Sequence, residues 1–260
     1  MEKIYVVSDT HCRDFYKDVL NVIDRRVVFL GDYMDPYWHE GFTDEEGIQK
    51  LKDIIKYKKS RPNDVTLLIG NHCLSWIWSW MGFERTSIDH YSELHKIYRD
   101  NIELFEPCKL IKDTLFVHAG VSKSWLREEN RRLERSGSNL IIDENNIVSY
   151  IDNEFRLELQ YDKATPNGRY PTLKSNIFNI GWARGGGSGV GGPFWSDFNS
   201  EFEDPGWNLW QVVGHQQSAQ TGIIRQCGNT YCLDSRAVFE YDLDSHKMEL
   251  SSLTKGYGKN

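Results

Sequence analysis

The sequence lacks any apolar run close to the roughly 20 residues that a helix needs to cross a bilayer. Its formal net charge is -7, so it has no basic excess to neutralise nucleic acid or an anionic membrane. Its five cysteines are an odd number and include no CxxC pair. The first predicted strand begins by Lys3, which leaves no room for a signal peptide. We therefore expect a cytoplasmic protein with no general nucleic-acid binding and no membrane partner.

The composition is that of a globular chain, with 39% hydrophobic and 27% charged residues. A length of 260 residues favours one domain over two, because α/β architectures of this size commonly form a single unit. The acidic balance does not exclude a phosphorylated substrate, since bound divalent cations would reverse the sign of the field inside a cleft.

Five short blocks of metal-ligand residue types each follow a short apolar, β-branched run. The runs span residues 4–7, 27–30, 65–69, 115–117 and 211–213. The blocks are Asp9-Thr10-His11, Gly31-Asp32-Tyr33-Met34-Asp35, Gly70-Asn71-His72, His118-Ala119-Gly120 and Gly214-His215. Because α/β proteins present active-site loops at the ends of strands, this repetition predicts a two-metal phosphoesterase.

Between the first blocks the hydrophobic spacing alternates between strand and helix. It predicts helices over residues 14–24, 44–59 and 91–105, the second with a capping box between Thr43 and Glu46. Right-handed crossovers fold such a series into a sheet with parallel strands. Trp76 and Trp80 share a helical face, which is more typical of a helix packed on the sheet than of an aromatic wall for a substrate ring.

The stretch between His118 and His215 departs from this alternation. Its predicted features are a charged helix over 123–135, an amphipathic helix over 147–159, a loop at 164–168 and a glycine-rich run at 185–192. We expect residues at about 122–205 to form a cap over the site, within a single domain of residues 1–260. Further strands are expected at 221–225, 230–233 and 238–241, with a hairpin turn at Gly228-Asn229.

The residue types in the blocks suit a pair of divalent cations. Asp9 and His11 are separated by one residue, so both side chains project to the same side of a strand end and can hold one cation. Asp32 can offer an oxygen to each of two ions roughly 3.5 to 4 Å apart, the separation that clamps both oxygens of a phosphoryl displacement. Asn71, His118 and His215 would complete the second ion. Manganese is the first expectation, although these ligands also admit iron, zinc, nickel or cobalt.

The ordered blocks DxH, GDxxD, GNH, HAG and GH resemble those of the calcineurin-like metallophosphoesterase superfamily. The blocks are most similar to those of the branch that contains phosphoprotein phosphatases and symmetrical dinucleoside-tetraphosphatases. The resemblance extends from the first strand to about Gln217. It implies an α/β fold of two facing mixed β-sheets flanked by helices, with the metals at the strand ends. It also implies Asp9, His11 and Asp32 as ligands of the first metal, and Asp32, Asn71, His118 and His215 as ligands of the second.

The resemblance implies further roles around these metals. His72 would donate a proton to the leaving alcohol and Asp35 would orient it, a pairing that favours the charged imidazolium. The nucleophile would be a water that bridges the ions. Pro36-Tyr37 follows Asp35 where protein phosphatases continue with Arg-Gly, and Cys12 and Cys73 replace the usual glycine and acidic residue. These departures leave the chemistry intact and make a protein phosphatase a minority interpretation.

Arg184 is the residue expected to neutralise the substrate phosphate, with Asn71 as a second contact. Arg184 opens the glycine-rich run, in the region where related phosphatases place a second phosphate-contacting arginine. A flexible cap loop is an equal alternative for this run, and Arg13 is a lesser candidate. Asp234 is more typical of a turn residue than of a site residue. Gln217 stands where many superfamily members have a second histidine, and its amide oxygen could substitute.

These patterns together predict a dimetal-dependent phosphohydrolase, most simply a phosphomonoesterase. Its substrate would be a phosphorylated small molecule, a nucleotide or a phosphoprotein. A phosphodiesterase or dinucleoside-polyphosphate hydrolase would use the same metals with a wider cleft. A noncatalytic scaffold would keep the fold and lose ligands, whereas this sequence retains the complete set.

Overall fold

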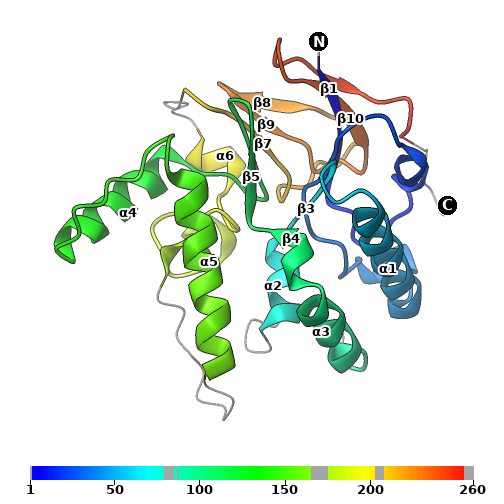
Figure 1. Cartoon of the computed structure of the whole chain (residues 1–260), viewed down its shortest axis with the longest axis horizontal. Helices are drawn as coiled ribbons and strands as arrows, with labels where there is room; N and C mark the ends of the chain where they lie inside the picture. Colours follow the sequence, from blue (N-terminus) through cyan, green and yellow to red (C-terminus); the bar gives the residue numbers. More distant parts are fainter. Residues whose placement is uncertain (1, 79–84, 87, 165–174, 203–207, 255–260) are drawn as a thin grey trace.

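A computed structural model describes residues 2–78, 85–86, 88–164, 175–202 and 208–254. Within these residues, two mixed β-sheets lie between groups of helices (Figure 1). One sheet has the order β11-β10-β1-β2-β3-β4 and the other the order β5-β6-β7-β9-β8. The strands of the first are β1 (Lys3–Val7), β2 (Val27–Phe29), β3 (Val65–Leu68), β4 (Phe105–Glu106), β10 (Val238–Asp242) and β11 (Met248–Leu250). Those of the second are β5 (Cys108–Ile111), β6 (Thr114–Val117), β7 (Trp210–Val213), β8 (Arg225–Cys227) and β9 (Thr230–Cys232).

The pairing of the strands matches the predicted crossovers. Strands β1 to β4 are parallel to one another, and β10 and β11 add an antiparallel edge. In the second sheet β6, β7 and β9 are parallel, while β5 and β8 are antiparallel to their neighbours. The β8–β9 hairpin turns at Gly228-Asn229, as predicted, with Cys227 opposite Thr230.

Helix α1 (Asp44–Ser60) forms where its capping residues and apolar spacing predict it. The Thr43 hydroxyl accepts from Glu46 N, and the Glu46 carboxylate accepts from Thr43 N. Acidic residues fill its first turn and Lys58 and Lys59 its last, which complements the helix dipole. The other helices are α2 (Asn71–Ile77), α3 (Tyr91–Asp100), α4 (Lys123–Arg135), α5 (Ile147–Ala164) and α6 (Phe198–Glu201).

Three predicted elements were wrong in type or extent. Residues 14–24 contain only the 3-10 helix η1 (Lys17–Asn21), and the buried Phe15 and Tyr16 precede it. The helix predicted over 91–105 ends at Asp100, since Phe105 pairs with Leu67 in the sheet. The strand predicted at 221–225 begins only at Arg225, after a turn with Gly222 at a positive φ of 74°.

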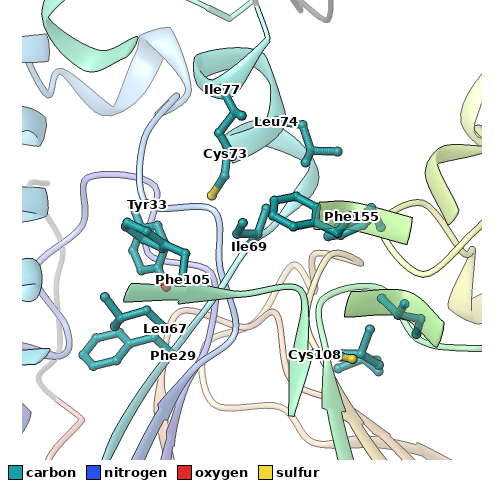
Figure 2. Packing of buried hydrophobic residues seen from close by; sticks show 14 of the residues in the cluster. Phe29, Tyr33, Leu67, Ile69, Cys73, Leu74, Ile77, Phe105, Cys108 and Phe155 are labelled. Carbon is teal, nitrogen blue, oxygen red and sulfur yellow. The ribbon is translucent and has the colours of Figure 1, made fainter. Parts of the chain in front are cut away.

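The hydrophobic core lies in two layers. Between the sheets, alternate residues of β1, including Ile4 and Val6, pack with Phe116 and Val212 of the facing sheet. On the other side of the first sheet, Figure 2 shows Phe29 and Leu67 in one cluster with residues of α2 and with Phe155 of α5. Trp76 and Trp78 are fully buried in this cluster, as the packing interpretation requires; Trp80 lies outside the described residues.

The helices α4 and α5 of the expected cap pack against this same core. Trp125 of α4 donates its indole N–H to the carbonyl of Asn176 at 3.0 Å, in the short helix η5 (Asn176–Phe178). Phe155 of α5 lies edge-on to Trp78, with ring centroids 5.6 Å apart. None of the described helices is both long enough and apolar enough to cross a membrane.

Candidate metal centre

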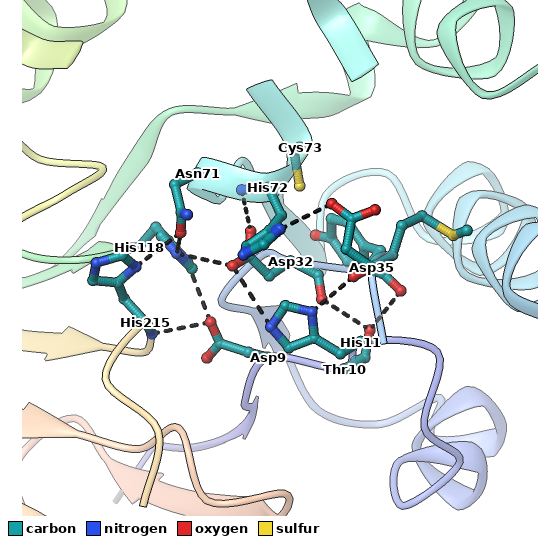
Figure 3. Close-up of polar contacts among 12 residues, drawn as sticks. Asp9, Thr10, His11, Asp32, Asp35, Asn71, His72, Cys73, His118 and His215 are labelled. Atoms are coloured by element: carbon teal, nitrogen blue, oxygen red, sulfur yellow. Dashed lines mark hydrogen bonds and ion pairs between the residues drawn. The ribbon is translucent and has the colours of Figure 1, made fainter. Parts of the chain in front are cut away.

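The five sequence blocks meet at the ends of strands from both sheets (Figure 3). Asp9, Asp32 and Asn71 follow β1, β2 and β3 of the first sheet. His118 and His215 follow β6 and β7 of the second sheet. The structure therefore brings together side chains that lie more than 200 positions apart in the chain, as in the 3.0 Å hydrogen bond from His215 N to Asp9 Oδ1.

Asp9, His11 and Asp32 form the first group of potential ligands. Their ligand atoms lie within 4.8 Å of one another, and all three residues are buried. The His11 Nδ1 atom lies 2.7 Å from the Met34 carbonyl, which directs Nε2 toward the carboxylates. That Nε2 lies 3.8 Å from Asp32 Oδ2, so one open position lies among an imidazole and two carboxylates.

Asp32 also faces the second group, which consists of Asn71, His118 and His215. Its Oδ2 atom lies 3.4 Å from His118 Nε2, while His118 Nδ1 is bonded to the Leu30 carbonyl at 2.8 Å. Asn71 Oδ1 lies 2.8 Å from both His118 Nε2 and His215 Nδ1. Asp32 therefore stands between the two groups, where a carboxylate that bridges two cations has to stand.

The donor atoms of this site fit bound cations better than they satisfy one another. Asp9 Oδ2 and His215 Nε2 are buried without a hydrogen-bond partner in the part of the chain that the structure describes. Such groups are costly unless something fills their coordination. Carboxylate, amide and imidazole donors together suit divalent first-row transition metals. A cation among them would use both of these atoms.

The thiols beside the site are not part of this donor set. Burial raises the pKa of Cys73 to about 12, so its sulfur is a neutral thiol that accepts a hydrogen bond from the Tyr98 hydroxyl at 3.6 Å. Burial also raises the pKa of Cys12, whose sulfur lies 4.0 Å from the Met34 sulfur. Neither sulfur belongs to the group of ligand atoms that lie within 4.8 Å of one another, which in the described part of the chain consists of Asp9, His11 and Asp32.

Burial and neighbouring charges shift the pKa values of the histidines and aspartates of the site. Burial lowers the pKa of His11 and of His215 well below the usual range. Burial also disfavours the charged form of His118, but Asp32 and Asp9 outweigh it and raise the His118 pKa to about 9. Burial raises the pKa of Asp9, to which Asp234 adds its repulsion. The carboxylates thus attract positive charge, which a cation would supply in place of a proton.

His72 and Asp35 form the pair that the sequence predicts. His72 Nδ1 lies 2.9 Å from Asp35 Oδ2, and the backbone N–H of His72 donates to Asp32 Oδ1 at 2.9 Å (Figure 3). The second bond fixes the start of α2 against the bridging carboxylate. Arg85, which the sequence analysis missed, lies on the other side of the ring, with Nη2 2.8 Å from His72 Nε2. No spacing signal links Arg85 to the blocks.

The backbone of the site is held in costly conformations. His11, Asp32, Asp35 and His215 have positive φ angles of 41°, 49°, 63° and 64°. The glycines of the blocks are explained by close approach: a Cβ on Gly70 would lie 2.1 Å from Asp32 Oδ1, and one on Gly214 would lie 2.1 Å from Asp9 Oδ2. Such concentrated strain is typical of a functional site.

A cavity of about 320 Å³ opens over these residues. Its wall also includes Tyr37, Arg85, Ala183, Arg184, Trp195, Gln217 and Asp234. Arg184 lines the cavity, where its Nε lies 3.2 Å from Asp197 Oδ2 and its Nη2 is bonded to Gln216. The glycines after Arg184 do not line it. They fold back on residues 180–182, as in the bond from Gly186 N to the Gly181 carbonyl at 3.1 Å.

Three minor candidates are also placed by the structure. Asp234, interpreted as a turn residue, is buried at the cavity; its Oδ1 atom has no hydrogen-bond partner among the described residues, and burial raises its pKa to about 6. Gln217 lines the cavity too. Arg13 does not: its guanidinium is paired with Glu40 at 2.9 and 3.1 Å.

Comparison with known proteins places this fold and site in a class. The family model of calcineurin-like phosphoesterases matches residues 2–215, and the chain belongs to this family. It is similar to a symmetrical bis(5'-nucleosyl)-tetraphosphatase of Buchnera aphidicola subsp. Schizaphis graminum, with 27% identity over 130 residues. That match covers 47% of this chain and 46% of the relative, less than half the length of either.

Solved structures agree on the fold. A cold-active protein-tyrosine phosphatase from a psychrophilic Shewanella species aligns with 96% of this chain and 80% of its own, at 14% identity and a TM-score of 0.51. A second structure of a cold-active protein tyrosine phosphatase aligns with 98% and 81%, at 15% identity and a TM-score of 0.55. The superfamily resemblance and the two-sheet α/β fold predicted from the sequence are therefore confirmed.

Proposed function

We propose that this chain is a dimetal-dependent phosphohydrolase that acts on phosphomonoesters. The observation that carries the proposal is the position of Asp32, with Oδ2 3.8 Å from His11 Nε2 on one side and 3.4 Å from His118 Nε2 on the other. Membership of the phosphoesterase family supports it. The cations would be two divalent ions, manganese first, with iron, zinc, nickel or cobalt as alternatives.

The residues of the two donor groups would each hold one cation. One ion would be held by Asp9, His11 and Asp32, and the other by Asp32, Asn71, His118 and His215. When bound, the ions supply Lewis acidity and make water acidic enough to provide a nucleophile near neutral pH. The protein's part is to fix the donors in a buried and strained frame, so that little reorganisation is needed during the reaction.

His72 would hold the proton that the leaving oxygen needs. Its Nδ1 is engaged by Asp35 at 2.9 Å, which orients the ring, while its Nε2 lies 2.8 Å from Arg85 Nη2. Because a guanidinium only donates, Arg85 would have to turn from Nε2 to a substrate oxygen before Nε2 could carry the proton. Arg184 and Asn71 would contact the phosphate, since both line the cavity and a guanidinium suits phosphate oxygens.

We also propose that residues at about 122–205 are a cap within a single domain of residues 1–260. A reducing, cytoplasmic setting is consistent with the absence of any disulfide among the five cysteines.

The size of the cavity supports a small substrate. Its volume of about 320 Å³ is at the lower end of the range for ligand pockets, which suits a compact phosphate ester. The second candidate is a dinucleoside-polyphosphate hydrolase, which is favoured by the sequence similarity to the Buchnera tetraphosphatase. That substrate would extend well beyond the cavity along the surface.

Parallel assays would separate these candidates. The purified protein would be given an alkyl phosphomonoester, an aryl phosphomonoester, an aryl phosphodiester and diadenosine tetraphosphate, each with manganese and with a chelator. We expect the highest kcat/KM on a monoester and no turnover with the chelator. Faster hydrolysis of the tetraphosphate would favour the second candidate. Absence of turnover on every substrate with every divalent ion would reject the proposal.

A further inference from the structure

Arg85 occupies a position in the cavity wall that the proposed chemistry does not yet use. Its Nη2 lies 2.8 Å from His72 Nε2, and its guanidinium carbon lies 4.1 Å from the centroid of the Tyr37 ring. The residue therefore lies against the cavity with one edge on the imidazole and one face on an aromatic ring. Neither partner is a carboxylate, so neither compensates the positive charge of the guanidinium.

The guanidinium of Arg85 retains unused donor capacity. Its Nη1 atom is buried and has no hydrogen-bond partner among residues whose placement is described. Within the same residues it forms no ion pair with a carboxylate, in contrast to Arg184 with Asp197 and Arg13 with Glu40. A buried, charged donor without an acceptor is costly, so an anion that enters the cavity gains more from Arg85 than from a side chain that is already paired.

The backbone that carries this ring is held in place. The backbone N–H of Tyr37 donates to Glu40 Oε2 at 3.1 Å, and Glu40 accepts from Nε and Nη2 of the buried Arg13 side chain. A guanidinium that lies flat on an aromatic ring keeps its N–H groups directed outward in its own plane. Tyr37 thus supports the guanidinium of Arg85 without consuming its N–H donors.

We infer that Arg85 is a phosphate-binding residue of this cavity, which contacts a phosphate oxygen of the substrate through its guanidinium and is positioned by the ring of Tyr37. The inference rests on the proposed function, because it takes the ligand of the cavity to be a phosphate. A planar fork of N–H donors matches the geometry of phosphate oxygens, which a single ammonium donor does not. Arg85 therefore selects for an anionic group next to His72.

Inorganic phosphate is the probe for the test, titrated by calorimetry into the manganese-loaded protein. Loss of a hydrogen bond to a charged group weakens affinity by about tenfold to a hundredfold, which is the effect expected for Arg85→Gln. Arg85→Lys keeps the charge without the fork and is expected to recover only part of the affinity. Arg156→Gln is the matched control, because Arg156 pairs with Asp152 and Glu103 away from the cavity. It should bind phosphate as the unaltered protein does.

The ring supplies a second, independent pair of variants. Tyr37→Phe keeps the aromatic face and is expected to retain more phosphate affinity than Tyr37→Leu, which removes the face and is expected to lose affinity severalfold. Near-UV circular dichroism would show whether Arg85→Gln folds. If it does not fold, the two Tyr37 variants test whether Arg85 binds phosphate. Equal affinities for Tyr37→Phe and Tyr37→Leu would then overturn the inference.

The outcomes also separate this inference from the proposed function. Normal hydrolysis by the unaltered protein together with full phosphate affinity in folded Arg85→Gln would overturn only the role of Arg85. A fall in kcat without a change in phosphate affinity would show that Arg85 merely supports His72, which also contradicts the inference. If the unaltered, metal-loaded protein neither hydrolyses phosphate esters nor binds phosphate, the proposed function fails and the inference fails with it.

Discussion

Individual residues at this site meet several structural demands at once, and Asp32 meets the most. Its Oδ1 accepts the backbone N–H of His72, while its Oδ2 faces His11 and His118. Its φ of 49° lies in the left-handed region, where a residue with a side chain costs on the order of 1 to 2 kcal/mol. The cost is sustained because the surrounding strands are packed on both faces, and it places the carboxylate between two donor groups.

His72 is the residue whose replacement separates chemistry from metal binding. We predict that His72→Asn keeps its metal and loses turnover by about a hundredfold or more on an alkyl phosphate, which needs a proton on its leaving oxygen. An aryl phosphate with an acidic leaving group should lose much less. Metal content by elemental analysis and kcat on both substrates would check this. Unchanged turnover of the alkyl ester would rule out the proton-donor role.

The sequence was informative about residues that follow strands and uninformative about the others. Each predicted ligand stands within four residues of the end of an apolar run, so its type and its position could be interpreted together. Arg85 has no such context: it lies between blocks, and only the folded chain brings it to His72. Asp234 follows a strand too, yet a turn explains an aspartate there equally well, and only its burial at the cavity separates the two.

At the level of elements, strands with β-branched residues and helices with caps were predictable, and elements that depend on distant partners were not. The capping box of α1 is a local signal and marked the start of the helix correctly. Phe105 fits the helical spacing that precedes it, but its pairing with Leu67 outweighs that local preference. The short strands β4 and β11 have too few residues to show any periodicity.

A buried carboxylate of α4 is hydrogen-bonded to three neighbouring side chains. Glu129 of α4 accepts from Arg132 at 2.7 Å, from Asn176 at 2.6 Å and from the hydroxyl of Tyr150 in α5. Burial alone would raise the pKa of Glu129, but these hydrogen bonds outweigh it and hold the pKa below its ordinary value of 4.5. The contribution of Glu129 to stability is therefore complete above pH 4.5 and is lost as the pH falls through the lower, folded-state pKa.

Replacement of this carboxylate should destabilise the protein in a pH-dependent way. We predict that Glu129→Gln lowers the free energy of unfolding by about 1 to 3 kcal/mol at neutral pH, because charged hydrogen bonds are replaced by weaker ones. The difference from the unaltered protein should narrow below pH 4.5. Urea unfolding at several pH values would measure it, with the exposed neighbour Glu128→Gln as control. A pH-independent difference would contradict the assignment.

At the scale of the whole molecule, the proposed metal centre joins the two sheets. Asp9, Asp32 and Asn71 belong to the ends of one sheet, while His118 and His215 belong to the ends of the other. Any ion held by both groups stabilises their packing, since a ligand that binds only the folded state adds to its stability. The contact of Trp78 with Phe155 extends the same core into α5, which supports the proposal of one domain with an integral cap.

The measurement that tests the central claim most directly is the electron paramagnetic resonance spectrum of the protein loaded with manganese. We predict two ions per chain with an exchange-coupled spectrum, because Asp32 faces both donor groups. Asp32→Asn should bind metal more weakly by over about a hundredfold and lose the coupled signal together with phosphatase activity. A single isolated manganese signal in the unaltered protein, or a coupled signal that survives in Asp32→Asn, would contradict a two-metal site bridged by this carboxylate.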